Sequence, residues 1–159
     1  MELGKSKIDQ TLVSQGVWTD FIIMGVGEPV EISLKLALMN ASQNAVYKAA
    51  LQKALDPFER MLQVYKSGKD IPAPLAKKIN DVGRRIFCEQ IVLGWGGEDP
   101  ANYRGPKKNG QPVAYTPDGG LALFEEFPEL LAQAEAEAQK FERYRISLLE
   151  DASGNSASA

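Results

Sequence analysis

The sequence contains no histidine and only one cysteine, Cys88, among its 159 residues. Histidine is the commonest general base in enzymes and the commonest neutral metal ligand, so both roles lose their usual residue. A lone cysteine can form neither an internal disulfide nor a Cys–His nucleophilic pair, and it cannot complete a zinc site of the usual cysteine–histidine type. The sequence therefore predicts a protein that is not an enzyme and that has no cofactor and no metal.

Carboxylates remain as candidates for catalysis, and they occur as two adjacent pairs, Glu125–Glu126 and Glu150–Asp151. Adjacent side chains on a helix point in different directions, so neither pair converges on one substrate atom. We interpret both pairs as solvated surface, and Cys88 as a small hydrophobic residue of the core.

Long apolar runs and an excess of positive charge are also missing. No stretch reaches the roughly 18 apolar residues that a membrane-spanning helix needs, and the N-terminal Met1–Ser6 lacks the apolar centre of a signal peptide. The net charge of −3 gives no cationic surface for nucleic acid or an anionic membrane. We expect no nucleic-acid partner, no membrane contact and a reducing compartment such as a cytoplasm.

What the chain does contain begins with a hairpin pattern, predicted over residues 17–38. Val17–Met24 is rich in aromatic and β-branched residues, and Gly25–Pro29 interrupts it. Large apolar residues then alternate with other residues at positions 30, 32, 34, 36 and 38, which places them on one face of a strand. Gly25-Val26-Gly27 is no phosphate-binding loop, because a strand follows it where such a loop needs a helix.

A helical period takes over in residues 41–94. One apolar stripe comprises Tyr47, Leu51, Leu55, Phe58, Leu62 and Tyr65. Asp56-Pro57-Phe58-Glu59 carries a helix-start signature inside this stripe, which predicts a kink or a second helix there. A further helix is predicted after Asp70, with a buried side formed by Leu75, Ile79, Val82, Ile86 and Leu93, and Gly94 is placed to end it.

Residues 95–116 are rich in glycine, proline and asparagine, which predicts a long loop with at most a small strand. Thr116-Pro117 starts the C-terminal helices, predicted over residues 117–149, the last of them long and beginning at Pro128. Residues 1–16 are predicted to be a flexible N-terminal arm, residues 17–150 a single domain, and residues 151–159 a disordered tail. The predicted class is α+β, mostly helical, with the hairpin followed by about four to five helices.

Large aromatic side chains are the candidates for contact with another protein, because such residues dominate binding energies at interfaces. Trp95, Phe124 and Phe127 are the predicted protein-binding residues, and Trp18 is a further possible anchor. The alternative for each is an ordinary place in the core. Trp95 lies at a predicted helix–loop border and Phe127 directly precedes a proline.

Three ordered stretches resemble the tail assembly chaperones of long-tailed, siphovirus-type bacteriophages. The first is Gly16-Val17-Trp18 with the alternating strand and then Asn44-Ala45-Val46-Tyr47, and the second is a helix-ending Gly94-Trp95 pair. The third is the turn Asn109-Gly110-Gln111-Pro112, continuing through Tyr115-Thr116-Pro117-Asp118 to Leu121 and Phe127-Pro128. The segment 98–106 departs from the family pattern as an apparent insertion, and the strand is less basic than is usual in the family.

The resemblance implies a non-enzymatic chaperone that binds the phage tape measure protein and keeps it soluble while the tail tube is assembled. It further implies a possible tail tube partner, a longer frameshifted form, and a location in the host cell cytoplasm and outside the mature virion. Homo-oligomers are possible. Two alternatives stay open: a structural virion component, such as a head–tail joining or tail terminator subunit, and a small phage regulator that binds a host protein.

Overall fold

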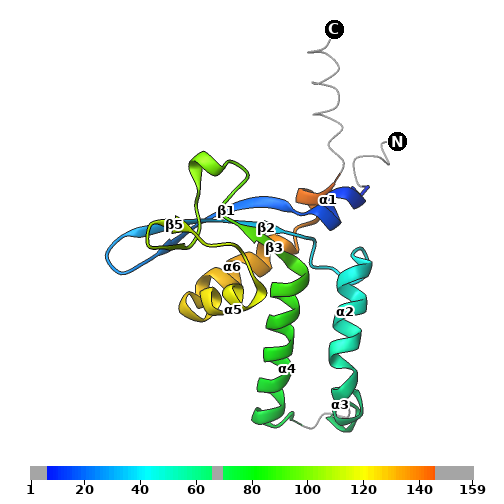
Figure 1. Cartoon of the computed structure of the whole chain (residues 1–159). Coiled ribbons are helices and arrows are strands. Elements are labelled where there is room, and N and C mark those ends of the chain that lie inside the picture. Colours follow the sequence, from blue (N-terminus) through cyan, green and yellow to red (C-terminus); the bar gives the residue numbers. More distant parts are fainter. Residues whose placement is uncertain (1–6, 66–69, 146–159) are drawn as a thin grey trace.

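The computed structural model describes residues 7–65 and 70–145. Its main sheet has three antiparallel strands in the order β1-β2-β3. Two C-terminal helices cover one face of the sheet, the segment after β3 crosses the other face, and a pair of helices extends away as an arm (Figure 1). The predicted α+β class is confirmed.

The predicted N-terminal hairpin is confirmed as strands β1 (Val17–Met24) and β2 (Pro29–Leu36). Their register runs without interruption from the pair Val17 and Leu36 to the pair Met24 and Pro29. The turn closes where the Gly25 amide donates a hydrogen bond of 3.0 Å to the Glu28 carbonyl. As the alternation predicts, the buried face of β2 carries Ile32, Leu34 and Leu36.

The prediction of a helix through Leu93 is wrong. Helix α4 (Ala73–Ile86) passes into a π-helical turn, η3 (Phe87–Ile91), and then into strand β3 (Val92–Trp95), which pairs with β2. The Ala37 amide donates a hydrogen bond of 2.8 Å to the Ile91 carbonyl, so the neighbouring backbone satisfies the end of the turn. The apolar period of the helix continues through Leu93 in the sequence. In the structure, however, this segment pairs with the edge of β2 as a strand, and Leu93 is 38% exposed.

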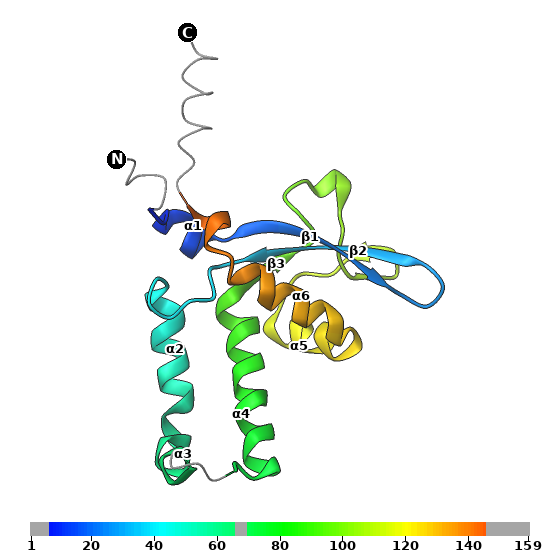
Figure 2. The ribbon, with the colours of Figure 1, turned by 180° about the vertical axis from the view of Figure 1, so that it is seen from behind.

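The helical arm consists of α2 (Ala45–Leu55), the 3₁₀ turn η2 (Asp56–Phe58), α3 (Glu59–Tyr65) and α4. The predicted break at Asp56 is confirmed as this 3₁₀ turn. Both views show α2 and α4 running side by side away from the sheet (Figures 1 and 2). The two helices contact each other, and α2 also contacts the π-helical turn at the base of the arm.

The predicted loop of residues 95–116 contains a 3₁₀ turn, η4 (Pro100–Asn102), and two short paired strands, β4 (Lys107–Lys108) and β5 (Gln111–Pro112). Two helices follow, α5 (Pro117–Glu126) and α6 (Pro128–Ala138). Thr116 caps α5 as predicted, because its hydroxyl oxygen accepts a hydrogen bond from the Gly119 amide.

Two predictions about the ends of the chain are wrong. The expected flexible arm contains helix α1 (Gln10–Gln15), and the last long helix stops at Ala138, before a separate 3₁₀ turn, η5 (Phe141–Tyr144). The physical reason is a small second core of Val13, Leu38 and Tyr144, which holds both segments against the end of the sheet. The Tyr144 hydroxyl donates a hydrogen bond of 2.9 Å to the Leu36 carbonyl. The predicted tail at 151–159 lies outside the described residues, as do residues 146–149 of the predicted last helix.

Candidate functional site

Trp95, the first predicted binding residue, is a structural residue at the end of β3. Its side chain is only 9% exposed, and its ring meets the Tyr115 ring edge-on at a centroid distance of 5.0 Å. The indole Nε1 donates a hydrogen bond of 2.6 Å to the Val113 carbonyl. A Cβ added at Gly119 would lie 3.0 Å from the ring, so α5 packs closely against it. These contacts use the ring within the chain.

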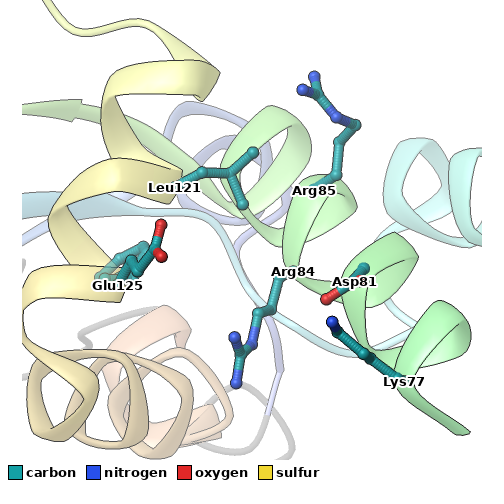
Figure 3. Close-up of a pocket in the computed structure, with 7 residues that line it drawn as sticks. Lys77, Asp81, Arg84, Arg85, Leu121 and Glu125 are labelled. Atoms are coloured by element: carbon teal, nitrogen blue, oxygen red, sulfur yellow. The ribbon is translucent and has the colours of Figure 1, made fainter. Parts of the chain in front are cut away.

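Phe124, the second predicted residue, is buried in the main core and packs against Phe87 with ring centroids 5.8 Å apart. It also borders a cleft of about 490 Å³ between α4 and α5, lined by Lys77, Asp81, Arg84, Arg85, Leu121, Phe124 and Glu125 (Figure 3). The cleft carries charges of both signs. Arg84 and Arg85 extend in opposite directions, and Arg85 forms an ion pair with Asp118 at 2.8 Å. The arrangement does not concentrate one charge on a ligand.

Phe127, the third predicted residue, reaches the surface. It is half-buried and contacts the main core, and it also lines a cleft of about 650 Å³ between the α5–α6 junction and the β1–β2 turn. Met24, Val26 and Val30 line the same cleft and are exposed apolar residues. We call Met24, Val26, Val30 and Phe127 the hairpin-tip surface. Of the three predicted residues, Phe127 alone belongs to an exposed apolar surface.

The arm carries a second apolar surface. A cleft of about 420 Å³ lies between α2, α4 and α6, with Leu51, Leu55, Ile79 and Gly83 among its lining residues. A second cleft of about 520 Å³ at the bend between α2 and α3 shares Leu51 and Leu55 and adds Leu62. The two clefts therefore form one continuous surface, called here the arm surface and defined by those five residues: Leu51, Leu55, Leu62, Ile79 and Gly83.

The arm has little core of its own. Tyr47 and Ile86, both at its base, are its buried hydrophobic residues. Further out, the large apolar side chains facing the clefts are only partly covered, and Val46, Met61 and Val64 on the same helices are exposed. An amphipathic helix pair is expected to bury its apolar stripe against another element. Within residues 45–65 and 73–86, much of that stripe is left available.

Sequence reasoning found the apolar stripe of the arm but did not identify it as a site. The stripe predicts a buried face, and only the tertiary structure shows that residues 7–65 and 70–145 supply too little to cover it. The hairpin tip was also missed. A signal was present in Ile22-Ile23-Met24: alternation in a strand buries Ile23, so Ile22 and Met24 must point outward.

Burial raises the pKa of several titrating groups in this part of the structure. Desolvation raises the pKa of the Cys88 thiol to about 11, and desolvation also raises the pKa of the Tyr115 hydroxyl, which donates a hydrogen bond to the Cys88 carbonyl. At neutral pH the thiol is therefore protonated and a poor nucleophile. At the base of the arm surface, burial raises the pKa of Glu135, an effect that the positive charge of Arg84 opposes.

Over residues 7–65 and 70–145, no group of three or more histidine, cysteine, aspartate or glutamate side chains is placed to hold a metal ion. No helix in the same ranges has both the length and the apolar character needed to cross a bilayer.

The fold and its exposed apolar clefts define an α+β protein with candidate protein-binding surfaces. Residues 42–155 match the model of a family described as YdaY prophage protein, and this match covers more than half of the chain. The chain therefore belongs to the YdaY prophage protein family and is phage-derived. No curated protein and no solved structure gives a significant match. The matched residues include the whole helical arm, α5 and α6.

Proposed function

We propose that this prophage protein is a tail assembly chaperone: a non-enzymatic protein that binds the phage tape measure protein in the host cytoplasm and keeps it soluble. The observation that carries the proposal is the arm surface. A long helical protein exposes apolar stripes before it is packed into a tail tube, and a groove between amphipathic helices is a suitable receptor for such a stripe. The sequence resemblance to tail assembly chaperones supports the same partner.

The chemistry of the arm surface specifies what it fits. At the bend between α2 and α3, its lining combines aliphatic side chains with Gln52, Asp56 and Glu59. A helix with one apolar stripe and a polar or basic flank satisfies both parts. Because most of the contact is apolar, raising the salt concentration to about 1 M should weaken the complex little, whereas a charge-driven contact would be screened.

The first experiment is co-expression with the tape measure protein encoded by the same prophage. We expect the chaperone to keep that protein in the soluble fraction and to co-purify with it. Failure of the intact chaperone to solubilise or bind the tape measure protein would contradict the proposal. Detection of the protein as a stoichiometric component of purified particles would favour the structural virion alternative. Capture of a host enzyme in place of the tape measure protein would favour the regulator alternative.

A second experiment localises the contact. Leu51→Asp places a carboxylate in the arm surface, and Ala49→Asp places the same group on the exposed side of the same helix. We expect Leu51→Asp to weaken binding at least about tenfold, equivalent to about 1.4 kcal/mol, and Ala49→Asp to leave binding unchanged. Circular dichroism and the melting temperature of each variant show whether it is folded. Equal binding by both folded variants would remove the arm surface from the contact.

A further inference from the structure

Within the described residues, the outer edge of strand β1 is unpaired along most of its length. β1 is the first strand in the order β1-β2-β3, so within residues 7–65 and 70–145 one of its sides has no strand beside it. Natural proteins protect such edges with lysine, proline, bulges or short strands, because an unpaired ladder pairs with other chains. β1 has eight residues, none of them lysine or proline, and its register with β2 has no bulge.

The hydrogen bonds of β2 show which backbone groups of β1 face that edge. The Ser33 amide donates to the Arg104 carbonyl and the Ser33 carbonyl accepts from the Gly96 amide, so both groups point away from β1. Asp20 lies opposite Ser33, and in an antiparallel ladder its own amide and carbonyl then point to the outer edge. The alternation of a strand gives Ile22 and Met24 the same orientation.

A side-chain contact at the other end of β1 agrees with this assignment and marks where the free edge begins. Arg143 approaches the Trp18 carbonyl at 3.5 Å and donates a hydrogen bond of 2.7 Å to the Thr19 hydroxyl. Arg143 thus covers the edge at Trp18. Among the described residues, no backbone hydrogen bond is formed by the outward groups of Asp20, Ile22 and Met24.

We infer that this free edge is the interface of a homodimer, in which β1 of one copy pairs antiparallel with β1 of a second copy. A two-fold axis through Ile22 places Ile22 opposite Ile22 and Asp20 opposite Met24, so the outward groups of all three residues meet a complementary strand. The two three-stranded sheets then form one continuous sheet. This inference is independent of the tape measure proposal.

Self-complementarity favours a second copy over another strand as the occupant. The central pair joins two isoleucines, and the two-fold register sets no like charges opposite each other. Apolar cross-strand pairs of this kind stabilise a ladder, whereas like charges directly opposite destabilise it. Asp20, the one charged residue of β1, is already paired with Arg104 at 2.9 Å within each chain. One two-fold contact covers both free edges and is closed, so it does not propagate into a fibre.

The test compares two matched substitutions by light scattering coupled to size-exclusion chromatography. Ile22 is 64% exposed at the edge, and Val46 is 65% exposed on α2 in the arm. We expect the wild-type protein and Val46→Lys to show twice the mass of the chain, and Ile22→Lys to show the mass of one chain with the circular dichroism spectrum of the wild type. A monomeric wild-type protein over a wide concentration range would overturn the inference. So would a dimer that survives Ile22→Lys, or one that only Val46→Lys dissociates.

A crosslinking experiment tests the register and does not rely on loss of a species. In a Cys88→Ala background, Ile22→Cys sets two cysteines opposite each other across the two-fold axis. We expect mild oxidation to link this variant into a covalent dimer rapidly, and to link the equally exposed Val46→Cys variant at least tenfold more slowly. Equal rates for the two cysteines would contradict the proposed register.

Discussion

The indole Nε1 of Trp95 donates a hydrogen bond of 2.6 Å to the carbonyl oxygen of Val113, and it thereby fastens strand β3 to the loop 18 residues later in the chain. The Tyr103 hydroxyl approaches the same carbonyl at 3.2 Å. Trp95 therefore organises the segment that crosses the sheet. Any role of Trp95 in binding a partner has to be distinguished from this structural role.

For Trp95 we predict a loss of stability rather than a direct loss of binding. Trp95→Ala should lower the free energy of unfolding by about 3–5 kcal/mol, because a large buried ring is removed. Trp95→Phe should cost less, about 1–2 kcal/mol, because an aromatic ring stays in the site and only the indole hydrogen bond is lost. Urea titration measures both changes. A fully stable Trp95→Ala protein that no longer binds its partner would restore Trp95 as an anchor.

Phe124→Ala and Phe127→Ala should differ in how much they lower the stability of the fold. Phe124→Ala removes a ring packed against Phe87 and should cost about 3–5 kcal/mol of stability. Phe127→Ala removes a half-buried ring, and we expect a loss of about 2 kcal/mol or less, with the fold retained. Thermal unfolding followed by circular dichroism distinguishes the two. Equal destabilisation would mean that Phe127 belongs to the core as fully as Phe124.

The sequence correctly predicted the elements that are determined by residues close together in the chain. The alternation from Val30 to Leu38 gave the hairpin, Asp56-Pro57 gave the break in the arm, and Thr116-Pro117 gave the start of α5. Each depends on residues within one or two turns of chain. Among the candidate residues, a position before proline placed Phe127 at a junction, and that junction lies at the surface.

The remaining features depend on contacts between distant segments, which periodicity does not encode. Leu93 continues the helical stripe of α4, yet β2 captures it as a strand. From the sequence, Val13 belongs to a flexible arm and Tyr144 to a long helix. In the structure both residues pack against Leu38 in one small core. Likewise, the arm surface stays exposed because too few of the described residues cover it, and this becomes visible only in the packed structure.

Asn44 should be more important for stability than an ordinary helix cap. Its side-chain oxygen accepts a hydrogen bond from the Tyr47 amide, and its side-chain nitrogen donates one of 3.0 Å to the Leu38 carbonyl. Thr116 is an exposed cap with the first kind of contact only, and Thr116→Ala should cost about 1 kcal/mol. We expect Asn44→Ala to lower the free energy of unfolding by clearly more, as measured by urea titration. Equal losses would show that the bond to Leu38 contributes nothing.

Gly83 provides a stabilising substitution inside the arm. A Cβ added there meets no atom within 4 Å, and alanine is favoured over glycine in a helix by about 1 kcal/mol. Gly83→Ala should therefore raise the melting temperature. Gly83→Phe should keep the fold but obstruct the arm surface, which Gly83 lines. If Gly83→Phe binds the tape measure protein normally, the partner lies elsewhere.

Cys88 should make stability depend on alkaline pH. Burial raises the pKa of its thiol from about 9 to about 11, so between these values the native state keeps a proton that the unfolded state releases. Stability then falls as the pH rises through this window, by at most about 1.4 kcal/mol per pH unit for one proton. Urea midpoints at about pH 8 and about pH 10.5 should fall more for the wild type than for Cys88→Ala. Parallel losses would assign the effect to the tyrosines, whose raised pKa values act in both proteins.

The hydrogen bond from Tyr144 to Leu36 joins positions 108 residues apart, which has a consequence for synthesis on the ribosome. The β1–β2 hairpin is made early, but β3, α6 and the Tyr144 turn that complete its surroundings are made much later. At about 5–20 residues per second, the hairpin waits roughly 5–20 s before its last native partner exists. During that interval its apolar inner face is open, so the order of translation leaves the N-terminal hairpin exposed to aggregation while the rest of the chain is made.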